Sequence, residues 1–570
     1  MLSRGRRSGP DLAVEYSDTK ARHPSGSLEV PMKRIIAIFL TLVVLLPAAP
    51  IAQPATPPEI RLILLIAVDQ LRYDYLTRFR DQYSSGLDRL LRGGAVFTDA
   101  HLEHYPTVTA VGHATMLTGA TPSVSGIVGN DWFDRESGKT ITSVTDGTVT
   151  PLGSDTGSAA SPRRLLVSTV GDELKMASAA AKGSPEAPRV IGVSLKDRSA
   201  ILTAGRSADA AYWWDTRSGH FVSSTYYFGA LPAWASAFNA RKMAHSYAGK
   251  HWTSLGADST VLREMPAEPG EPLYSAVNGS PYGNDLLLAF AEEALAQERL
   301  GQRGVTDVFS VSFSSNDSIG HTHGPDSPQV RDVTIRTDRS IGQLLDRVDA
   351  LVGLRHTVVV LTTDHGVAPL PETLKDQGLI GGRMTSKDIS GAIQQALDKR
   401  YRKGDWVLAM AGSSPYLNYE LIEKGRYDPA EVRRVAAAAA STVPHVTRVY
   451  TRDQLQQGHV AGDRFGSRVL RGFNEQRSGD LEILLEPYWI RQATGTSHGT
   501  PYNYDSHIPL ILMGPRITPG EYADHVALND LAPTLATLLG LSSPSGSSGR
   551  VLTEALTAPA AGRRITRQQP

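Results

Sequence analysis

Apolar runs alternate with amphipathic segments between about residue 59 and residue 541. The first run, Glu59–Gln70 (EIRLILLIAVDQ), is rich in β-branched residues and ends in an acid, which predicts a buried parallel strand. Four later runs have the same character: Arg189–Asp197, Thr306–Asp317, His356–Gly366 and His507–Pro515. Apolar positions with helical spacing lie between them, as in Asn284–Leu300 and Arg336–Val352. This alternation predicts an α/β fold, a mostly parallel central sheet with helices on both faces.

Two regions interrupt the alternation of strands and helices. Residues from about 131 to 280 are rich in Gly, Ser, Trp and Tyr and contain a hairpin-like segment, Tyr212–Val222. Residues from about 385 to 487 predict a smaller α+β insertion. We interpret both as insertions, or cap segments, in one catalytic domain over residues 59–545. Its last helix, Ala527–Leu541, should stop at Gly540, and residues 546–570 should form a loose tail.

The N-terminal pattern is typical of an export signal. Lys33 and Arg34 precede an apolar run over residues 35–46, followed by small residues. A run of twelve residues is short for a membrane span. We therefore expect translation to start at Met32, a signal peptide over residues 32–52, and a mature protein that begins near Gln53 and lacks residues 1–31. This predicts a periplasmic or secreted protein with no stable membrane span after cleavage, and an uncleaved anchor is the alternative.

Composition narrows the partners and the possible metal ligands. Lys plus Arg and Asp plus Glu both number 58, so no excess charge indicates binding to nucleic acid or to a membrane surface. The chain has no cysteine, which excludes disulfides and thiolate metal ligands. Stability must then come from the core, or from metal ions held by histidine and carboxylate side chains.

Acids and histidines gather where the predicted strands end. Asp69 ends the first strand, Asp317 the third, and Asp364 with His365 the fourth. The carboxyl ends of parallel strands meet at one edge of a sheet, where ligands bind, so these side chains should converge. Asp317 also precedes His321 by one helical turn. Carboxylate oxygens mixed with imidazole nitrogens, without sulfur, favour Zn²⁺ in an open catalytic site.

Each of these residues also has a structural interpretation. A single Asp at a strand end usually caps a helix or forms a turn. Most single histidines are structural, and this is our interpretation of five of them: His101, His104, His113, His323 and His507. A further candidate ligand is His498, in GTSHGTPYNYD. The convergence of several acids and histidines on one sheet favours the metal-site hypothesis.

The segment Tyr105–Gly119 (YPTVTAVGHATMLTG) contains four threonines. A threonine hydroxyl is a weak nucleophile near neutral pH and needs a base or a metal ion to activate it. The residues alone do not choose among Thr107, Thr109, Thr115 and Thr118. They also permit a simple hydrogen-bonded turn at the start of a helix.

Seven segments, taken in order, resemble the alkaline phosphatase superfamily. They are AVDQLRYDYL, YPTVTAVGHATMLTG, GIVGNDWFD, SLKDRSA, NDSIGHTHGP, TTDHG and GTSHGTPYNYDSHIPLILMGP, spread from about Ile60 to Leu541. The chain is most similar to the nucleotide pyrophosphatase/phosphodiesterase branch and, within it, to the bacterial phosphate-irrepressible alkaline phosphatases. The resemblance implies the fold of that superfamily and hydrolysis of small-molecule phosphate monoesters, for phosphate scavenging.

The resemblance also implies two zinc ions per chain. One would be held by Asp317, His321 and His498. The other would be held by Asp69, Asp364 and His365 together with the hydroxyl of Thr109. Thr109 occupies the position of the family nucleophile, which forms a phosphothreonine intermediate.

Three further residues match the phosphate-binding positions of the family. Asn130 would donate its side-chain amide to a non-bridging oxygen. Lys196 and Arg198, two apart at a strand end, would point the same way and favour the extra charge of a monoester, although a solvated Lys-Asp-Arg turn is the structural alternative. The functional alternative is a phosphodiesterase or nucleotide pyrophosphatase on the same scaffold. Arg72, Tyr73 and Tyr105 are expected at the edge of the pocket.

Overall fold

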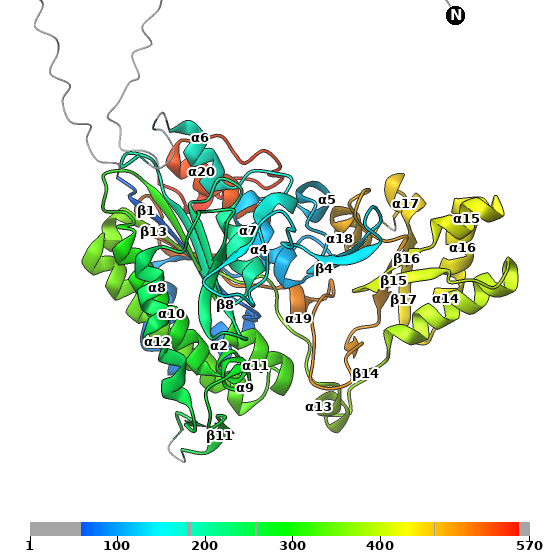
Figure 1. Cartoon of the computed structure of the whole chain (residues 1–570), viewed down its shortest axis with the longest axis horizontal. Coiled ribbons are helices and arrows are strands. Elements are labelled where there is room, and N and C mark those ends of the chain that lie inside the picture. Colours follow the sequence, from blue (N-terminus) through cyan, green and yellow to red (C-terminus); the bar gives the residue numbers. More distant parts are fainter. Residues whose placement is uncertain (1–58, 179, 181–183, 257–258, 461, 558–570) are drawn as a thin grey trace, which may run out of the picture. The chain divides into compact units, whose positions relative to one another are not determined.

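The computed structural model of the chain describes residues 59–178, 180, 184–256, 259–460 and 462–557. The predicted signal peptide and the last residues of the predicted tail lie outside this part. A ten-stranded sheet forms the centre (Figure 1). In spatial order its strands are β21 (Gly520–Tyr522), β2 (Ala95–Phe97), β20 (Leu510–Met513), β13 (Thr357–Thr362), β1 (Leu62–Val68), β12 (Asp307–Phe313), β7 (Val190–Ser194), β8 (Ala210–Asp215), β9 (His220–Ser224) and β6 (Pro151–Leu152).

The five central strands, from β13 to β8, are parallel, as predicted. Leu62 of β1 is in register with Asp307 on one side and Thr357 on the other. The prediction for the run His507–Pro515 was wrong in direction, because β20 pairs antiparallel with both β13 and β2. A strand buried on both faces is continuously apolar whichever way it runs, so its composition does not carry its direction.

Helices cover both faces of the sheet, as predicted (Figure 1). Alternate side chains of β1 enter different cores: Leu64 packs in one hydrophobic cluster and Leu65 in the other. The first face is covered by α3 (Gly86–Gly93), α10 (Pro281–Gln297) and α12 (Pro328–Leu351). The second is covered by α4 (Thr109–Thr118), α6 (Val170–Ala177), α7 (Asp197–Ala204) and α20 (Leu531–Leu539). Gly540 ends α20 in a left-handed conformation, as expected of a C-cap glycine.

The region of about 131–280 contributes β6, β7, β8 and β9 to the central sheet. The predicted hairpin is confirmed: β8 and β9 pair antiparallel, with Trp213 opposite Val222. In the predicted tail, Leu552 and Ala555 are buried in the same cluster as α20, so this part packs against the core. No helix in the described part of the chain combines the length and apolar character that a bilayer crossing requires.

The region of about 385–487 builds a hydrophobic cluster of its own, which includes Ile393, Trp406 and Ile483. Its elements are α14 (Ser386–Arg400), β15 (Val407–Ala411), β16 (Ser414–Leu417), α15 (Tyr419–Gly425), α16 (Pro429–Ala440), β17 (Val446–Thr451), α17 (Arg452–Gln456), α18 (Arg464–Gly472) and β18 (Leu481–Leu485). The Tyr105 hydroxyl donates to the Ile483 carbonyl at 2.9 Å. That bond ties β18 to the loop that precedes α4, so this region lies beside the carboxyl edge of the sheet.

Candidate active site

Four of the predicted ligands lie at the ends of neighbouring parallel strands. Asp69 directly follows β1, and its backbone N–H donates to Phe313, the last residue of β12, at 2.9 Å. Asp364 and His365 follow β13, and both are fully buried. Asp317 lies in the first turn of α11 (Ser315–His323), directly after β12. The strand ends thus bring the acids to one edge, as the sequence predicts.

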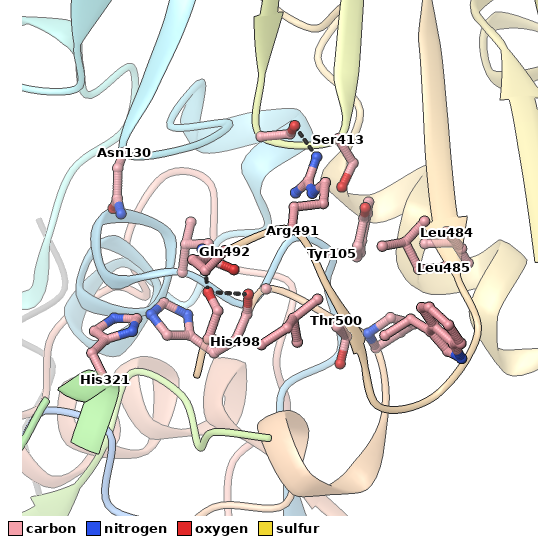
Figure 2. Close-up of a pocket in the computed structure, with 17 residues that line it drawn as sticks. Tyr105, Asn130, His321, Ser413, Leu484, Leu485, Arg491, Gln492, His498 and Thr500 are labelled. Atoms are coloured by element: carbon pink, nitrogen blue, oxygen red, sulfur yellow. Dashed lines mark hydrogen bonds between the residues drawn. The ribbon is translucent and has the colours of Figure 1, made fainter. Parts of the chain in front are cut away.

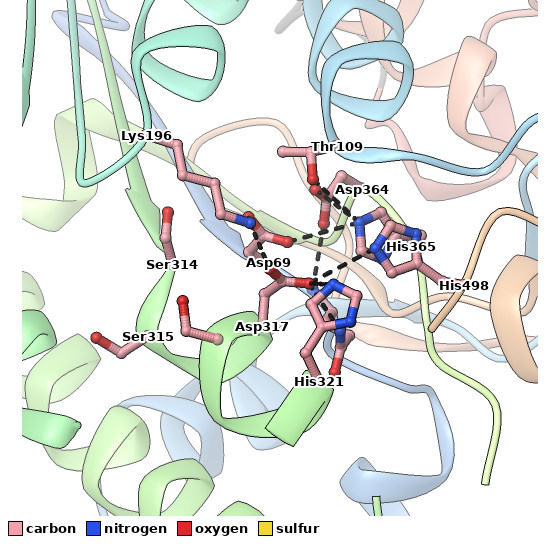
Figure 3. Close-up of polar contacts among 12 residues, drawn as sticks. Asp69, Thr109, Lys196, Ser314, Ser315, Asp317, His321, Asp364, His365 and His498 are labelled. Atoms are coloured by element: carbon pink, nitrogen blue, oxygen red, sulfur yellow. Dashed lines mark hydrogen bonds and ion pairs between the residues drawn. The ribbon is translucent and has the colours of Figure 1, made fainter. Parts of the chain in front are cut away.

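The histidines converge on these carboxylates (Figure 3). His321 Nε2 lies 3.2 Å from Asp317 Oδ1, one helical turn away, and His498 Nε2 lies 3.7 Å from the same oxygen. His365 Nε2 lies 3.6 Å from Asp69 Oδ1 and 3.3 Å from Asp364 Oδ2. All six predicted ligands therefore lie together, and we call them the ligand cluster.

Two groups within the ligand cluster have donor atoms close enough to share an ion. The donor atoms of Asp317, His321 and His498 lie within 4.8 Å of one another, and so do those of Asp69, Asp317 and His365. The first group matches the predicted triad. The second contains Asp317 where the resemblance implied Asp364, so Asp317 lies between the two groups.

Backbone carbonyls hold each imidazole of the ligand cluster in one orientation. The Nδ1 atoms of His321, His365 and His498 lie 2.7, 2.9 and 2.9 Å from the carbonyls of Thr496, Gly366 and Thr107. A carbonyl only accepts, so each Nδ1 carries the proton and each Nε2 lone pair points into the cluster. Burial also lowers the pKa of His365 and of His498, which keeps both rings neutral, the state in which imidazole binds a metal.

The carboxylates are buried without enough hydrogen-bond donors. Asp69 Oδ1 and Asp364 Oδ2 are inaccessible and have no hydrogen-bond partner in the described part of the chain. Burial, and then the neighbouring Asp364, raises the pKa of Asp69. Burial would also raise the pKa of Asp317, but the Lys196 ammonium, and His321 in its protonated form, lower it well below its ordinary range. Buried carboxylates of this kind require cations, and the nitrogen and oxygen donor set fits divalent metal ions.

Thr109 is the one threonine of its segment that faces the ligand cluster. It is the first residue of α4, is buried, and its Oγ1 lies 3.3 Å from His365 Nε2. The other three hydroxyls donate to carbonyls: Thr107 to Thr500 at 2.8 Å, Thr115 to Val111 at 2.9 Å and Thr118 to Ala114 at 2.6 Å. The N-terminus of a ten-residue helix also stabilises negative charge at Thr109.

Asn130 lies just before β4 (Asp131–Asp134), beside the start of α4. Its Oδ1 accepts a hydrogen bond from the backbone N–H of Ala110 at 2.8 Å. That bond assigns the amide orientation, because the oxygen faces the helix and the NH₂ group is left as the donor. Asn130 is therefore a candidate donor next to Thr109.

Lys196 reaches the ligand cluster and Arg198 does not. Lys196 Nζ donates to Asp69 Oδ2 and to Asp317 Oδ2, at 2.6 Å each. The strand-end geometry expected for the pair was wrong: β7 ends at Ser194, Lys196 caps α7, and Arg198 lies in the first turn of that helix. Successive residues of a helical turn point in different directions, so the pair does not share one face as it would on a strand. The Arg198 Nη1 lies 3.9 Å from the carboxylate of Asp197.

Two residues that contact the ligand cluster were not predicted to do so. Gln70 was not predicted at all, and His113 was expected to be only structural. Gln70 Nε2 donates to Asp317 Oδ1 at 2.6 Å, and its backbone N–H donates to Asp364 Oδ1 at 3.2 Å. Its position directly after Asp69 was the only signal available. His113 is buried, as expected of a structural histidine, but its Nδ1 lies 2.9 Å from the Thr109 carbonyl and 3.2 Å from Asp364 Oδ2.

A cavity of about 320 Å³ adjoins the ligand cluster (Figure 2). Asn130, His321 and His498 line it from the core, and Tyr105 lines it as expected. Arg72 and Tyr73 instead line a separate cavity, with Tyr488, Tyr504 and His507. The ligand cluster therefore opens to a space large enough for a small organic molecule.

A solved structure identifies the fold as alkaline phosphatase-like. The crystal structure of the alkaline phosphatase PafA superposes with a TM-score of 0.81 at 31% identity, covering 88% of this chain and 99% of that one. Together with the ligand cluster and the buried threonine, this fold defines the class of the protein as a hydrolase. A sequence model of the Type I phosphodiesterase / nucleotide pyrophosphatase family matches residues 63–505. The chain belongs to that family.

Relatives of known name match nearly the whole chain. PhoV, an alkaline phosphatase of Synechococcus elongatus, is 32% identical over 535 residues, 88% of this chain and 94% of its own. PafA of Elizabethkingia meningoseptica is 32% identical over 526 residues, 88% of this chain and 95% of its own. A protein of Myroides odoratus named calcium-transporting ATPase is 34% identical over 526 residues, 87% of this chain and 94% of its own.

Proposed function

We propose that the chain is an alkaline phosphatase that hydrolyses phosphate monoesters through a phosphothreonine at Thr109. The observation that carries this proposal is the placement of one hydroxyl. Of four threonines in the segment, Thr109 alone presents its oxygen to the ligand cluster, at the N-terminus of a helix. The relatives named alkaline phosphatases support it.

Asp317, His321 and His498 would hold one zinc ion, and Asp69, Asp364 and His365, with the Thr109 hydroxyl, the other. The two unpartnered buried oxygens and the anchored imidazoles support this assignment. Two zinc ions bound there would lower the pKa of the Thr109 hydroxyl and offset the charge on the attacking and departing oxygens.

The side chains of this chain then have separate tasks. Thr109 Oγ1 attacks phosphorus, the ester P–O bond breaks, and the alcohol leaves while phosphate stays on the threonine. Water then cleaves the phosphothreonine, which releases inorganic phosphate and restores the hydroxyl. The Asn130 amide and the Lys196 ammonium bind non-bridging oxygens and hold phosphorus in line.

The second part of the proposal concerns Arg198, which we expect to favour phosphate monoesters over diesters. A solved variant of PafA carries replacements of a threonine, an asparagine, a lysine and an arginine, the residue types of Thr109, Asn130, Lys196 and Arg198. We propose that Arg198 turns toward the extra charged oxygen of a monoester. The alternative is a phosphodiesterase or nucleotide pyrophosphatase, and the family match favours it as a secondary activity.

Two measurements test the proposed function. Thr109→Ala should lower kcat for an aryl phosphate by at least about 10⁴-fold, as loss of a nucleophile does, while metal content and circular dichroism stay largely unchanged, because three other ligands of that ion remain. Retained turnover would remove Thr109 as the nucleophile. Comparing kcat/KM for a monoester and a diester with the same leaving group decides between the two ester classes.

The cellular setting is part of the same proposal. An exported enzyme that releases phosphate from external small-molecule esters fits the signal-like segment at residues 32–52. N-terminal sequencing of the protein recovered from the periplasm or medium tests it. A protein retained in the cytoplasm with its leader intact would contradict export.

A further inference from the structure

The 320 Å³ cavity opens to one side of the ligand cluster. His321 and His498 line it, whereas Asp69 and Asp364 do not. In the proposed reaction the ion held by Asp317, His321 and His498 would face the departing oxygen, because the Thr109 hydroxyl lies against His365, a ligand of the other ion. The alcohol part of the substrate would then extend into this cavity, and this step rests on the proposed function.

One part of the cavity wall, opposite the ligand cluster, is apolar, whereas Ser413, Gln492 and Thr500 line other parts. The apolar part comes from the region of about 385–487 and the residues that follow it, and comprises Leu484, Leu485, Trp489 and Ile490, with Val108 added from the core side. Walls of this kind suit the carbon skeleton of an alcohol, and the volume suits one ring-sized group. Trp489 is held in place by stacking on His445, with ring centroids 3.3 Å apart.

Arg491 lies next to this apolar part of the wall, close to Ser413 and Gln492 (Figure 2). No Asp or Glu is among the residues that line the cavity, so Arg491 is its permanently charged side chain. Its Nη1 donates to the Gly412 carbonyl, and no described carboxylate forms an ion pair with its guanidinium. A guanidinium donates five hydrogens in a planar fork, so most of its donors are free for a ligand.

Glu482, the acid that acts electrostatically on Arg491, faces a different cavity. Glu482 lines a neighbouring cavity of about 150 Å³, which Arg491 and Tyr105 also line. Ser414 Oγ donates to Glu482 Oε2 at 2.7 Å. Burial raises the pKa of Glu482 to about 7. Glu482 is among the residues that line the neighbouring cavity and not among those that line the 320 Å³ cavity, so Arg491 has no acidic neighbour in the wall of the latter.

We propose that this cavity is the subsite for the departing alcohol, and that Arg491 selects monoesters whose alcohol carries a second anionic group. Carboxylate and phosphate both accept two parallel hydrogen bonds from a guanidinium, so either group meets the requirement. The apolar wall and the single cation together favour a compact carbon skeleton with one acidic substituent over a neutral alcohol.

The test compares three aryl phosphates: meta-carboxyphenyl phosphate, resorcinol bisphosphate and the uncharged meta-carbamoylphenyl phosphate. We expect Arg491→Met to lower kcat/KM for a charged ester by about 10- to 100-fold more than for the carbamoyl ester, the usual effect of a charged hydrogen bond. For each ester we take the ratio of kcat/KM between the native enzyme and the variant, which cancels the differences in leaving-group reactivity. Arg448→Met removes an exposed arginine outside the cavity and should leave every ratio unchanged.

Equilibrium binding gives a readout that does not need turnover. In the Thr109→Ala background, Arg491→Met should weaken calorimetric binding of meta-carboxyphenyl phosphate and change that of the carbamoyl ester much less. If only one of the carboxylate and bisphosphate arms shows the effect, that arm identifies the group recognised. Equal losses on charged and uncharged esters would overturn the proposal.

The outcomes separate this inference from the proposed function. If no monoester is hydrolysed, the proposed function fails. If monoesters are hydrolysed but Arg491→Met shifts no ratio, only the role of Arg491 fails. Should Arg491→Met not fold, Arg491→Gln is measured, and Arg491→Lys, which keeps the charge, should retain part of the preference. Loss of the preference in Arg448→Met as well would point to a general charge effect and overturn the proposal.

Discussion

Two clusters in this molecule contain the same residue types but differ in construction. Most of the ligand cluster is buried: the side chains of His365 and Asp364 are both 0% exposed, and only His321 is partly exposed, at 35%. The second cluster, which we call the surface cluster, consists of Asp99, His101 and His525, whose donor atoms also lie within 4.8 Å of one another. There the side chains of His525 and Asp99 are 56% and 44% exposed.

The donor atoms lie at similar distances in the two clusters, and it is the hydrogen bonds of the histidines and carboxylates that differ. In the surface cluster the histidines bind the carboxylate itself: His101 Nε2 lies 2.9 Å from Asp99 Oδ1, and His525 Nδ1 lies 3.0 Å from Asp99 Oδ2. Asp99 is thereby satisfied. In the ligand cluster the imidazoles donate their Nδ1 protons to backbone carbonyls, and the buried Asp69 Oδ1 and Asp364 Oδ2 have no hydrogen-bond partner among the described residues. Composition alone therefore does not make a metal site, whereas the supporting bonds do.

Removal of the metal should have the largest effect. Charge stabilisation by a bound ion contributes several kcal/mol, so chelation should lower kcat/KM by at least about 10³-fold. Asp364→Ala should have a similar effect and lower the bound metal measured by plasma emission spectrometry. Asp99→Ala, the matched change in the surface cluster, should leave turnover and metal content as they are. Unchanged hydrolysis after exhaustive chelation would contradict the metal-dependent mechanism.

A smaller contrast comes from replacing one histidine in each cluster. His321→Ala removes one donor of a triad, and we expect turnover to fall by about 10²-fold or more, with partial loss of metal. His525→Ala should change turnover and metal content very little. It should also change stability little, because an exposed ion pair contributes about 0–1 kcal/mol. If the two variants lost equal amounts of metal, the distinction between the clusters would be wrong.

Lys196 sharpens the comparison because it contacts the ligand cluster and is a candidate for substrate binding. If it binds the dianionic phosphoryl group, Lys196→Ala should reduce kcat/KM for a monoester by about 10- to 100-fold more than for a diester with the same leaving group. Arg198→Ala should also reduce kcat/KM more for the monoester than for the diester, but by a smaller factor, since Arg198 does not reach the ligand cluster. Equal losses on both esters would make Lys196 only a counter-charge for Asp69 and Asp317.

Much of this site could be predicted from the sequence because strand ends and ligand types are local patterns. Asp69, Asp364 and His365 follow apolar runs, and parallel strands bring their ends together whatever the loops do. Choosing among four threonines needed either the family resemblance or the hydrogen bonds of Thr107, Thr115 and Thr118, which depend on tertiary contacts.

The rest depended on geometry that composition does not carry. The direction of β20 was not predictable, because an apolar strand looks the same in both directions. The positions of Lys196 and Arg198 depended on where β7 ends and α7 begins, and element boundaries are weakly encoded. Arg491 was missed because Tyr105, His321 and Gly412, which bring it into the cavity beside the ligand cluster, come from segments far away in the sequence.

The smallest expected effect tests how closely the backbone of the ligand cluster is packed. An added Cβ at Gly112 of α4 would lie 2.4 Å from the Asp364 carbonyl oxygen and 2.5 Å from its Cα. Backbone cannot move aside as a flexible side chain can, so Gly112→Ala should shift α4, and Thr109 with it, away from Asp364. We expect a loss of about 1–3 kcal/mol in unfolding free energy, as for overpacked cores, with a measurable fall in kcat/KM.

Gly391 of α14 provides the matched control for this change. It is also a helical glycine, but an added Cβ there meets nothing within 4 Å. Gly391→Ala should therefore raise stability by up to about 1 kcal/mol, the helix propensity difference between the two residues, without altering turnover. Chemical denaturation and kcat/KM measured on both variants check the pair. If Gly112→Ala behaved like Gly391→Ala, close contact between α4 and the strand end of β13 would not be what positions Thr109. Thr109 would then have to be positioned by His113, whose Nδ1 lies close both to the Thr109 carbonyl and to Asp364 at the same strand end.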